Sequence, residues 1–542
     1  MDRGSIRDLE EQIREHEGDT TELKRTRNSL LNVSKLPPEV LSDIFLWNVV
    51  PKDDFDELDE GSHNFLFVCH HWFEVASCTP ELWSFWGDSL KDWTRWCHHP
   101  GTAPLDLILD ANYGLGDDKV RNSSRFGTTL RNALQDRAAN NAIRRVHLAA
   151  SDPELLNSIL ASLTSNNGEL RSNCIESFIL WNLDDSASVD VSDFFAHYRF
   201  PRLQRIDFIG CTISSWDHLT SRTSALTTLE LDFGKPPPTP TTSQLLSIFT
   251  SNPTLRKVIL LGCAVPNDGN DESSTRVQLH HLKELQLDGS LRHVIRLLHQ
   301  LDHPRNMDHL CLNVYDCNLS DIPQIIGLYL QDHFQRRNKS QNGLNLRVSS
   351  EHQVAYRSSL IEFRAGDAGG INLSAPDWAQ INTFVVIAIV LNGTPPKSVL
   401  ERAALDLVPC APLEEVVYFH AQSNPAVMED THTQFPNLRA LSFDATSLPT
   451  AFSNPNLIGD GRVFPSLEHV LLDHLVDNDG DWSPLVDFLA CRVSSGNRLD
   501  TLVIAGSPHV CRQVIKAIRG MVRELKADHL DPACPSGACR GP

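Results

Sequence analysis

The apolar pattern L-x-x-L-x-L recurs along most of the chain after residue 142, and it constrains the fold more than any other feature. Its last two apolar residues alternate with polar ones, as on a β-strand with one buried face, and the first precedes that strand. Where the series is unbroken, successive segments begin about 23 to 32 positions apart, a period that predicts stacked repeats. The segments are Ile143-Val146-Leu148, Ile175-Phe178-Leu180, Leu203-Ile206-Phe208, Leu226-Leu229-Leu231, Leu255-Val258-Leu260, Leu282-Leu285-Leu287, Met307-Leu310-Leu312, Leu413-Val416-Tyr418, Leu438-Leu441-Phe443, Leu467-Val470-Leu472 and Leu499-Leu502-Ile504.

Helix-sized segments lie between several of these strands. Ser151 and Asp152 offer a cap ahead of Pro153, and apolar residues then follow at helical spacing up to Leu163. Similar stretches are Gln244 to Phe249, Leu291 to Leu301, Ile322 to Phe334 and Pro484 to Cys491. Strand and helix in alternation predict an α/β fold, a curved parallel sheet with outer helices. A single repeat cannot bury its own apolar face, so the repeats must stack.

Two of the segments extend to L-x-x-L-x-L-x-x-C, from Leu203 to Cys211 and from Leu255 to Cys263. This pattern resembles leucine-rich repeats, a family in which the ninth position takes Asn or Cys. The resemblance implies a degenerate leucine-rich-repeat solenoid over residues 143–525. Where the pattern is poorest, Leu360-Phe363 and Ile381-Phe384-Val386 are interpreted as strands, and the distance from Met307 to Leu360 accommodates two repeats.

Residues 34–86 carry a second, helical pattern. Pro37 and Pro38 predict a helix start, because proline is tolerated in the first turn of a helix. A second apolar run, from Phe65 to Ala76, predicts another short helix, and Thr79-Pro80-Glu81 begins a third turn. So small a unit has little interior, and apolar surface left exposed on it usually marks a partner.

The order and spacing of motifs in this stretch resemble an F-box. The motifs are Leu36-Pro37-Pro38-Glu39-Val40-Leu41, Ile44-Phe45, Val68-Cys69, Trp72 and Leu82-Trp83. In that family a small all-α unit docks on the Skp-type adaptor of cullin-RING ubiquitin ligases. The resemblance implies that the adaptor is bound by Leu36, Pro37, Pro38, Val40, Leu41, Ile44, Phe45, Val68, Cys69, Trp72, Leu82 and Trp83. The chain departs from the family in the acidic loop Asp53 to Glu60, where a short connection is usual. A three-helix cap that closes a neighbouring domain is the alternative.

These patterns divide the chain into five parts. Residues 1–33 form an N-terminal helix with heptad spacing from Ile6 to Leu30, which is either a solvated helix or a coiled coil. The F-box spans 34–86, a connecting segment spans 87–142 and includes a strand at 104–110, and the solenoid spans 143–525. We expect the tail at 526–542 to be disordered.

Charge and composition restrict the partners and the compartment. The formal net charge is −21, from 69 acidic and 48 basic residues, and no concentrated basic stripe is evident, so we expect neither nucleic acid nor an anionic membrane as a partner. No run of about eighteen apolar residues occurs, and the charged N-terminus lacks a secretory signal. Thirteen scattered cysteines without a Cys-x-x-Cys pair predict reduced thiols in the cytoplasm or nucleus.

Motifs that could support chemistry are incomplete. Cys97-His98-His99 and the pair Cys534 and Cys539 lack a second half-site for zinc. Gly366 to Gly370 lacks the lysine of a P-loop, and Ser507 lacks the second glycine of a nucleophile elbow. Asp477, Asp479 and Asp481 lack the glutamate that completes a calcium loop. Flexible turns and isolated side chains are the favoured interpretation of each.

The sequence therefore predicts a protein that is not an enzyme and that needs no cofactor or metal. The function that the resemblances imply is a substrate-recruiting F-box subunit of a Skp-cullin-F-box ubiquitin ligase. It would bind the Skp-type adaptor, through it a cullin, and an unknown protein target through the solenoid. The alternative is a structural protein-interaction scaffold that does not act in ubiquitination.

Overall fold

The computed structural model consists of two compact units, Met1–Asn252 and Pro253–Pro542. The residues that it describes are 15–16, 18–25, 28, 32–49, 64–83, 85–86, 104–110, 143–164, 174–184, 187–197, 199–233, 239–262, 264–266, 276–302, 307–317, 344–353, 358–367, 383–392, 416–421, 436–444, 464–473, 482–505 and 512–527. Residues 15–16 and 18–25, within the predicted N-terminal helix, are helical and exposed. The disordered tail predicted from residue 526 begins too early, because Lys526 and Ala527 belong to a strand that pairs with its neighbour, and residues 528–542 lie outside the described residues.

A helical segment, residues 32–83, opens the first unit. Its elements are η1 (Asn32–Lys35), α2 (Pro38–Val49), η2 (Asn64–Phe67), α3 (His70–Ser77) and η3 (Pro80–Trp83). The predicted helix start at Pro37-Pro38 is confirmed. The second predicted helix is divided, because the chain is extended at Cys69, with φ −164° and ψ 168°, between a 3-10 turn and α3.

Parallel strands continue the first unit. They are β1 (Phe85–Trp86), β2 (Leu105–Asp110), β3 (Ile143–Ala150), β4 (Ser177–Asn182), β6 (Arg205–Ile209) and β8 (Thr228–Phe233), and each pairs in parallel with the next. The register places Leu148, Leu180, Phe208 and Leu231 in one row across four strands, and all four are buried. The L-x-x-L-x-L pattern thus specifies both strand position and register.

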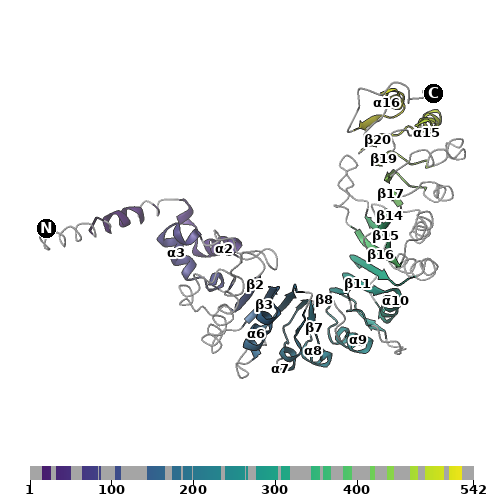
Figure 1. Cartoon of the computed structure of the whole chain (residues 1–542). Coiled ribbons are helices and arrows are strands. Elements are labelled where there is room, and N and C mark those ends of the chain that lie inside the picture. The colour runs from purple at the N-terminus through teal and green to yellow at the C-terminus, as the bar shows by residue number, and fades with distance from the viewer. Residues whose placement is uncertain are drawn as a thin grey trace. The chain divides into compact units, whose positions relative to one another are not determined.

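Helices cover one side of these strands (Figure 1). α6 (Pro153–Thr164), α7 (Ser192–His197), α8 (Trp216–Arg222) and α9 (Thr242–Ser251) pack one against the next in that order. A short parallel pair, β5 (Val189–Asp190) and β7 (Cys211–Thr212), joins two of the repeats. Beneath α7, the rings of Phe178 and Phe208 meet edge to face with centroids 5.2 Å apart. Aromatic packing therefore fills the space between helix and sheet.

The second unit repeats the parallel arrangement at both of its ends. β9 (Lys257–Gly262), β11 (Glu284–Ser290) and β13 (His309–Tyr315) pair in parallel, with α10 (Leu291–Gln300) and the small pair β10 (Val277–Gln278) and β12 (Leu301–Asp302) beside them. Further along, β17 (Val416–Ala421), β18 (Ala440–Asp444), β19 (His469–Asp473), β20 (Thr501–Ile504) and β21 (Glu524–Ala527) pair in parallel, with α15 (Ser483–Ser494) and α16 (Arg512–Arg519).

Three long strands interrupt this parallel order. β14 (Leu344–Gln353), β15 (Ser358–Asp367) and β16 (Thr383–Asn392) form an antiparallel meander, ordered β13-β16-β15-β14-β17 in the sheet. The strand predicted at Leu360-Phe363 is present as β15, and Phe384 and Val386 of the other predicted strand lie on β16, whereas Ile381 lies outside the described residues. The prediction that regular repeats continue through Leu360 is wrong, because β15 runs antiparallel to both neighbours. Only residues 354–357 connect β14 to β15, too few for the crossover that a parallel pair needs.

The predicted α/β fold with a parallel sheet is confirmed in each unit. Every L-x-x-L-x-L segment places its last two apolar residues on a strand. The helices predicted at 153–163, 244–249, 291–301 and 484–491 correspond to α6, α9, α10 and α15. The helix predicted at Ile322 to Phe334 lies outside the described residues. α9 begins with a capping box, in which the Thr241 and Gln244 side chains each accept a hydrogen bond from the other residue's backbone N–H.

One turn of the first unit leaves no room for a side chain. Asn182 is buried and its Nδ2 donates to the carbonyl oxygens of Ala187, at 2.7 Å, and Gly210, at 3.0 Å. Gly210 has φ +64°, and a Cβ built there would lie 2.2 Å from the backbone oxygen of Asn182. The next residue, Cys211, donates its thiol hydrogen to backbone oxygens and is fully buried, which raises the pKa of the thiol well above its ordinary value. This thiol is therefore structural and unreactive.

We expect Gly210→Ala to destabilise the first unit by about 2 kcal/mol or more, because the left-handed backbone and the close approach both oppose a Cβ. Gly496→Ala is the matched control, since Gly496 also has a positive φ, +82°, but no atom lies within 4 Å of its Cβ position. That control should cost only about 1 kcal/mol. Urea denaturation measures both, and equal losses would contradict the close approach.

Candidate functional site

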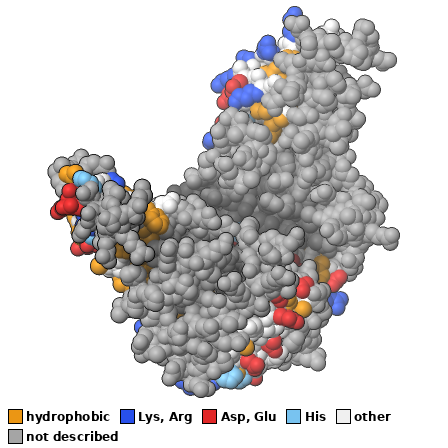
Figure 2. All heavy atoms as spheres, turned by 60° about the vertical axis from the view of Figure 1, so that its left-hand side comes forward, with side chains coloured by type: hydrophobic (Ala, Val, Ile, Leu, Met, Phe, Trp, Pro, Cys, Tyr) orange, Lys and Arg blue, Asp and Glu red, His pale blue; other side chains and the backbone are white. Residues whose placement is uncertain are grey.

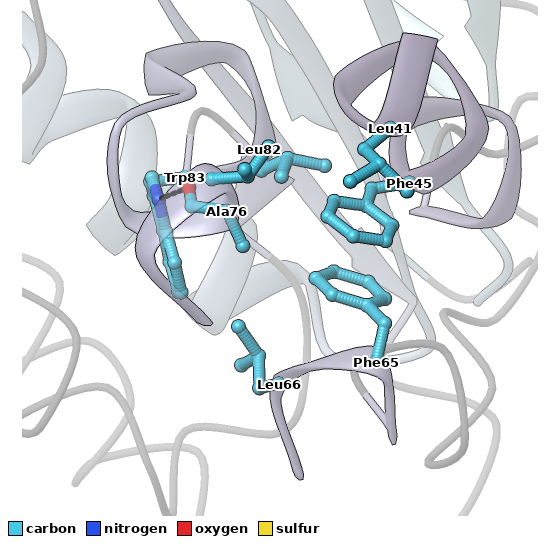
Figure 3. Close-up of a cluster of buried hydrophobic side chains, with 8 residues drawn as sticks. Leu41, Phe45, Phe65, Leu66, Ala76, Leu82 and Trp83 are labelled. Atoms are coloured by element: carbon cyan, nitrogen blue, oxygen red, sulfur yellow. Dashed lines mark hydrogen bonds between the residues drawn. The ribbon is translucent and has the colours of Figure 1, made fainter. Parts of the chain in front are cut away.

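The helical segment has a small core of its own (Figure 3). The core consists of Leu41, Phe45, Phe65, Leu66, Val75, Ala76, Leu82 and Trp83, with Leu36, Leu46 and Trp72 partly buried against it. The Phe45 and Phe65 rings stack with centroids 4.4 Å apart and an interplanar angle of 7°. Trp72 meets Phe45 at 5.2 Å in a tilted arrangement. The core therefore joins residues from both sides of the acidic loop, 53–60, which lies outside the described residues.

Hydrogen bonds fix η3 against the two helices. The Trp83 indole Nε1 donates to the Ala76 carbonyl oxygen at 2.8 Å, the contact dashed in Figure 3. The Thr79 hydroxyl donates to the Val75 carbonyl oxygen at 2.8 Å, so the Ser42 hydroxyl, 2.8 Å away, must be the donor in their mutual bond. These bonds hold α2, α3 and η3 in a defined arrangement. The surface of the helical segment depends on this arrangement.

Apolar side chains also cover the outside of this segment. Val40, Ile44 and Trp47 are spaced as one face of α2 and are exposed by 41%, 40% and 80%. Phe67 is 80% exposed and Val68 53%. Of the ten large apolar side chains that are exposed in the described part of the chain, seven lie between Val33 and Phe73. Figure 2 shows orange side chains gathered on this N-terminal part.

The residues predicted to contact an adaptor divide into three groups by position. Pro37, Pro38, Val40, Ile44 and Val68 are exposed. Leu36, Cys69 and Trp72 are half-buried. Leu41, Phe45, Leu82 and Trp83 lie inside the core. The last group can act on a partner only indirectly, by holding the shape of the segment. The motif therefore contains both exposed residues, which can contact a partner, and core residues, which hold the exposed ones in position.

Sequence reasoning missed two of the most exposed apolar residues, Trp47 and Phe67. Trp47 lies three residues after Ile44 and seven after Val40, so helical periodicity alone could have placed it on the exposed face of α2. Phe67 ends a 3-10 turn whose two preceding residues, Phe65 and Leu66, are buried. Because Phe65, Leu66 and Phe67 are all apolar, the sequence does not indicate which of the three faces solvent. The exposure of Phe67 could therefore not be predicted from periodicity.

The helical segment is attached to the sheet of the same unit. β1 follows η3 after one residue and pairs with β2, with Phe85 opposite Asp106. Asp106 is fully buried and receives two hydrogen bonds from Arg144, from Nε at 2.9 Å and from Nη2. This contact raises the pKa of Arg144 above its ordinary value, although burial opposes the charge. A paired guanidinium and carboxylate thus stabilise the junction of β2 and β3.

The opposite face of the sheet offers a second, polar surface in this unit. The side chains of β8 alternate between buried and half-buried, which leaves Glu230 on the open face. Its register partner Asp207 accepts hydrogen bonds from Trp181 Nε1 and Arg205 Nη2, both at 3.0 Å. Burial, and then the charge of Glu230, raise the pKa of Asp207 above its ordinary value. The network joins one guanidinium, of Arg205, to the carboxylates of both Asp207 and Glu230 within the protein, so that these polar side chains already have partners.

The motifs considered for chemistry add nothing to these surfaces. Gly366 and Asp367 end β15, whereas residues 368–370, 477–481, 507, 97–99, 534 and 539 lie outside the described residues. Within the described ranges, no group of three or more His, Cys, Asp or Glu side chains could hold a metal ion. No helix in the described part of the chain is both long and apolar enough to cross a membrane.

Comparison with known proteins does not assign a family. No protein-family model matches the chain, and no curated protein matches it. The F-box and leucine-rich-repeat resemblances therefore rest on the residues of this chain alone.

Core and surface residues of α2 should respond differently to truncation. We expect Phe45→Ala to destabilise the helical segment by about 3–5 kcal/mol, because it leaves a cavity beside Phe65. Trp47→Ala should leave stability within about 0.5 kcal/mol of wild type, since the side chain is 80% exposed. Hydrogen exchange over residues 38–83 measures both variants. Loss of protection in Trp47→Ala would show that Trp47 belongs to the core.

The raised pKa of Asp207 gives the protein a specific pH dependence. Because the folded state favours the protonated carboxyl, its contribution to stability is present below the unfolded pKa, about 3.8, and is lost as pH rises through the folded pKa. We therefore expect wild type to gain stability relative to Asp207→Asn as pH falls from neutral towards 4. Urea denaturation at several pH values measures this difference. A difference that stays constant between neutral pH and pH 4 would contradict the raised pKa of Asp207.

Proposed function

We propose that this chain is a substrate-recruiting F-box subunit of a Skp-cullin-F-box ubiquitin ligase. The observation that carries the proposal is the concentration of exposed apolar side chains on the helical segment, where the F-box resemblance also lies. Monomeric soluble proteins rarely expose contiguous apolar patches of large size, so such a surface usually binds a partner. The partner of this proposal is the Skp-type adaptor, which connects the chain to a cullin.

The adaptor would bind the exposed residues, and the buried ones would support them. Val40, Ile44 and Trp47 form the helical part of this surface, and Val68 belongs to the second motif of the resemblance. Fully burying a side chain of this size contributes about 1.5–3 kcal/mol before the costs of association are subtracted. Three or four such side chains would supply several kcal/mol towards an interface before those costs. The proposal thus assigns the contacts to Val40, Ile44, Trp47 and Val68, and the support to Leu41, Phe45, Leu82 and Trp83.

The repeats would recruit the target of the ligase. We interpret the parallel strands with helices beside them as degenerate leucine-rich repeats, whose sheet would hold a protein target. Ubiquitin transfer would be catalysed by other subunits, and this chain would supply proximity and orientation. Such a role needs no catalytic group, cofactor or metal in this chain. It would operate in the cytoplasm or nucleus.

The test is a binding measurement with the purified full-length chain and a purified Skp-type adaptor. We expect wild type to bind, and the double variant Ile44→Asp, Trp47→Asp to bind at least about 100-fold more weakly, because it places two charges in a desolvated interface. The matched control is Leu183→Asp, Val493→Asp, which changes two apolar side chains exposed by 46% and 41% outside the helical segment.

This control should bind as wild type does, and circular dichroism should show that all three proteins are folded. Failure of wild type to bind would contradict the proposal. Capture of the adaptor without a cullin from a mixture that contains both would favour the alternative, a scaffold that does not act in ubiquitination.

A further inference from the structure

A basic surface lies near the C-terminal end of the second unit. Between Arg498 and Lys526, six Lys or Arg residues stand against two acidic ones, in a chain whose formal net charge is −21. Figure 2 shows blue side chains gathered at this end. These residues form no basic stripe in the sequence, because they are spread over a loop, a helix and a strand. The fold brings them to one end of the unit.

The elements that carry the basic residues are packed together. α16 contacts both α15 and β21, and its Ile515 and Ile518 are buried. Lys516 and Arg519, three residues apart on the same helix, are exposed. The backbone N–H of Arg523 donates to the Leu499 carbonyl oxygen at 3.0 Å, which brings the segment after α16 against the loop before β20. Charges distant in sequence therefore share one surface.

Part of this surface is neutralised and part is not. Arg523 Nη1 lies 3.0 Å from an Asp500 carboxylate oxygen, which neutralises its charge. Arg498 Nη2 donates to the Val522 carbonyl oxygen, a bond that holds the guanidinium in place and leaves its charge unpaired among the described residues. Lys526 lies 3.6 Å from Glu524. Among the described residues, no carboxylate lies within ion-pair distance of Lys516 or Arg519. The face of α16 therefore presents two available cations, and Arg498 and Arg523 are held in fixed positions nearby.

We propose that this basic surface, with Lys516 and Arg519 as its available cations, binds an Asp- and Glu-rich segment of a partner protein. Carboxylates spaced along an extended segment match cations that are spread over a surface, whereas a single phosphate favours cations that converge on one point. A long polyanion such as DNA would also meet the negative charge of the rest of the chain. A short acidic segment responds mainly to charges within a Debye length, about 8 Å at physiological ionic strength.

Binding of the acidic segment does not depend on the proposed function. Only the further statement that the partner is a target of a ubiquitin ligase rests on the proposed function. The experiment therefore uses the full-length chain without an adaptor, so that failure of this inference and failure of the F-box proposal can be distinguished.

The probe is a fluorescein-labelled short peptide in which Asp and Glu alternate with Gly, and binding is followed by fluorescence anisotropy. We expect saturable binding that weakens as sodium chloride is raised, and a loss of about tenfold in affinity in Lys516→Glu, Arg519→Glu. The matched control, Arg276→Glu, Arg292→Glu, makes the same change in net charge at two exposed cations elsewhere in the second unit. This control should bind the peptide as wild type does.

Three results would overturn the inference. Equal losses in the two variants would show that net charge alone governs binding. Equal affinity for a peptide with Asn and Gln in place of Asp and Glu would show that carboxylates are not recognised. Tighter binding of a phosphoserine peptide, of a DNA duplex or of vesicles that contain an anionic lipid would assign the surface to a different ligand.

Discussion

The fold depends on the burial of one apolar row per strand, which no strand can achieve alone. Leu180 on β4 lies between Leu148 and Phe208, and its side chain is removed from water only when both neighbouring strands are in register. The same condition applies to each parallel strand of the unit, so that the stability of one repeat resides largely in its neighbours. A shift in register by one residue would turn every apolar row towards the opposite face. The periodic sequence is therefore a requirement of stability.

The turns and junctions convert this periodic sheet into a specific structure. The backbone oxygen of Asn182 approaches Gly210 so closely that only glycine fits at this contact between two successive repeats. At the beginning of the unit, β1 continues from the helical segment into the sheet, and Arg144 stabilises the next junction through buried Asp106. The helical segment is thus an extension of the sheet, which limits the directions in which its exposed apolar face can point relative to the strands of the same unit.

The sequence predicted those helices and strands whose apolar residues recur at a regular spacing over a few neighbouring positions. Leu229 and Leu231 alternate on one strand, and Pro153 opens a helix after a capping residue, so both elements could be located from spacing alone. The meander of β14, β15 and β16 was missed because its apolar residues fit a repeat pattern equally well. Only the short connection at 354–357 distinguishes a hairpin from a parallel crossover. The motif that resembles an F-box located the helical segment, but residue type did not distinguish Phe45, in the core, from exposed Val40 or Trp47, since all are apolar.

The apolar face of α2 and the basic surface near the C-terminal end of the second unit differ in how far the sequence alone can reveal them. The apolar face of α2 comes from residues close in sequence, so a local motif can identify it. The basic surface around Lys516 and Arg523 comes from separate elements, and its charge is hidden in a total of −21. Because screening confines electrostatic interaction between exposed charges to about 8 Å at physiological ionic strength, a partner responds to the charges that the fold gathers, whatever the total. Net charge is therefore a weak guide to the partners of a protein built from stacked repeats. Each repeat contributes side chains to the surface, and the surface exists only when the repeats are stacked.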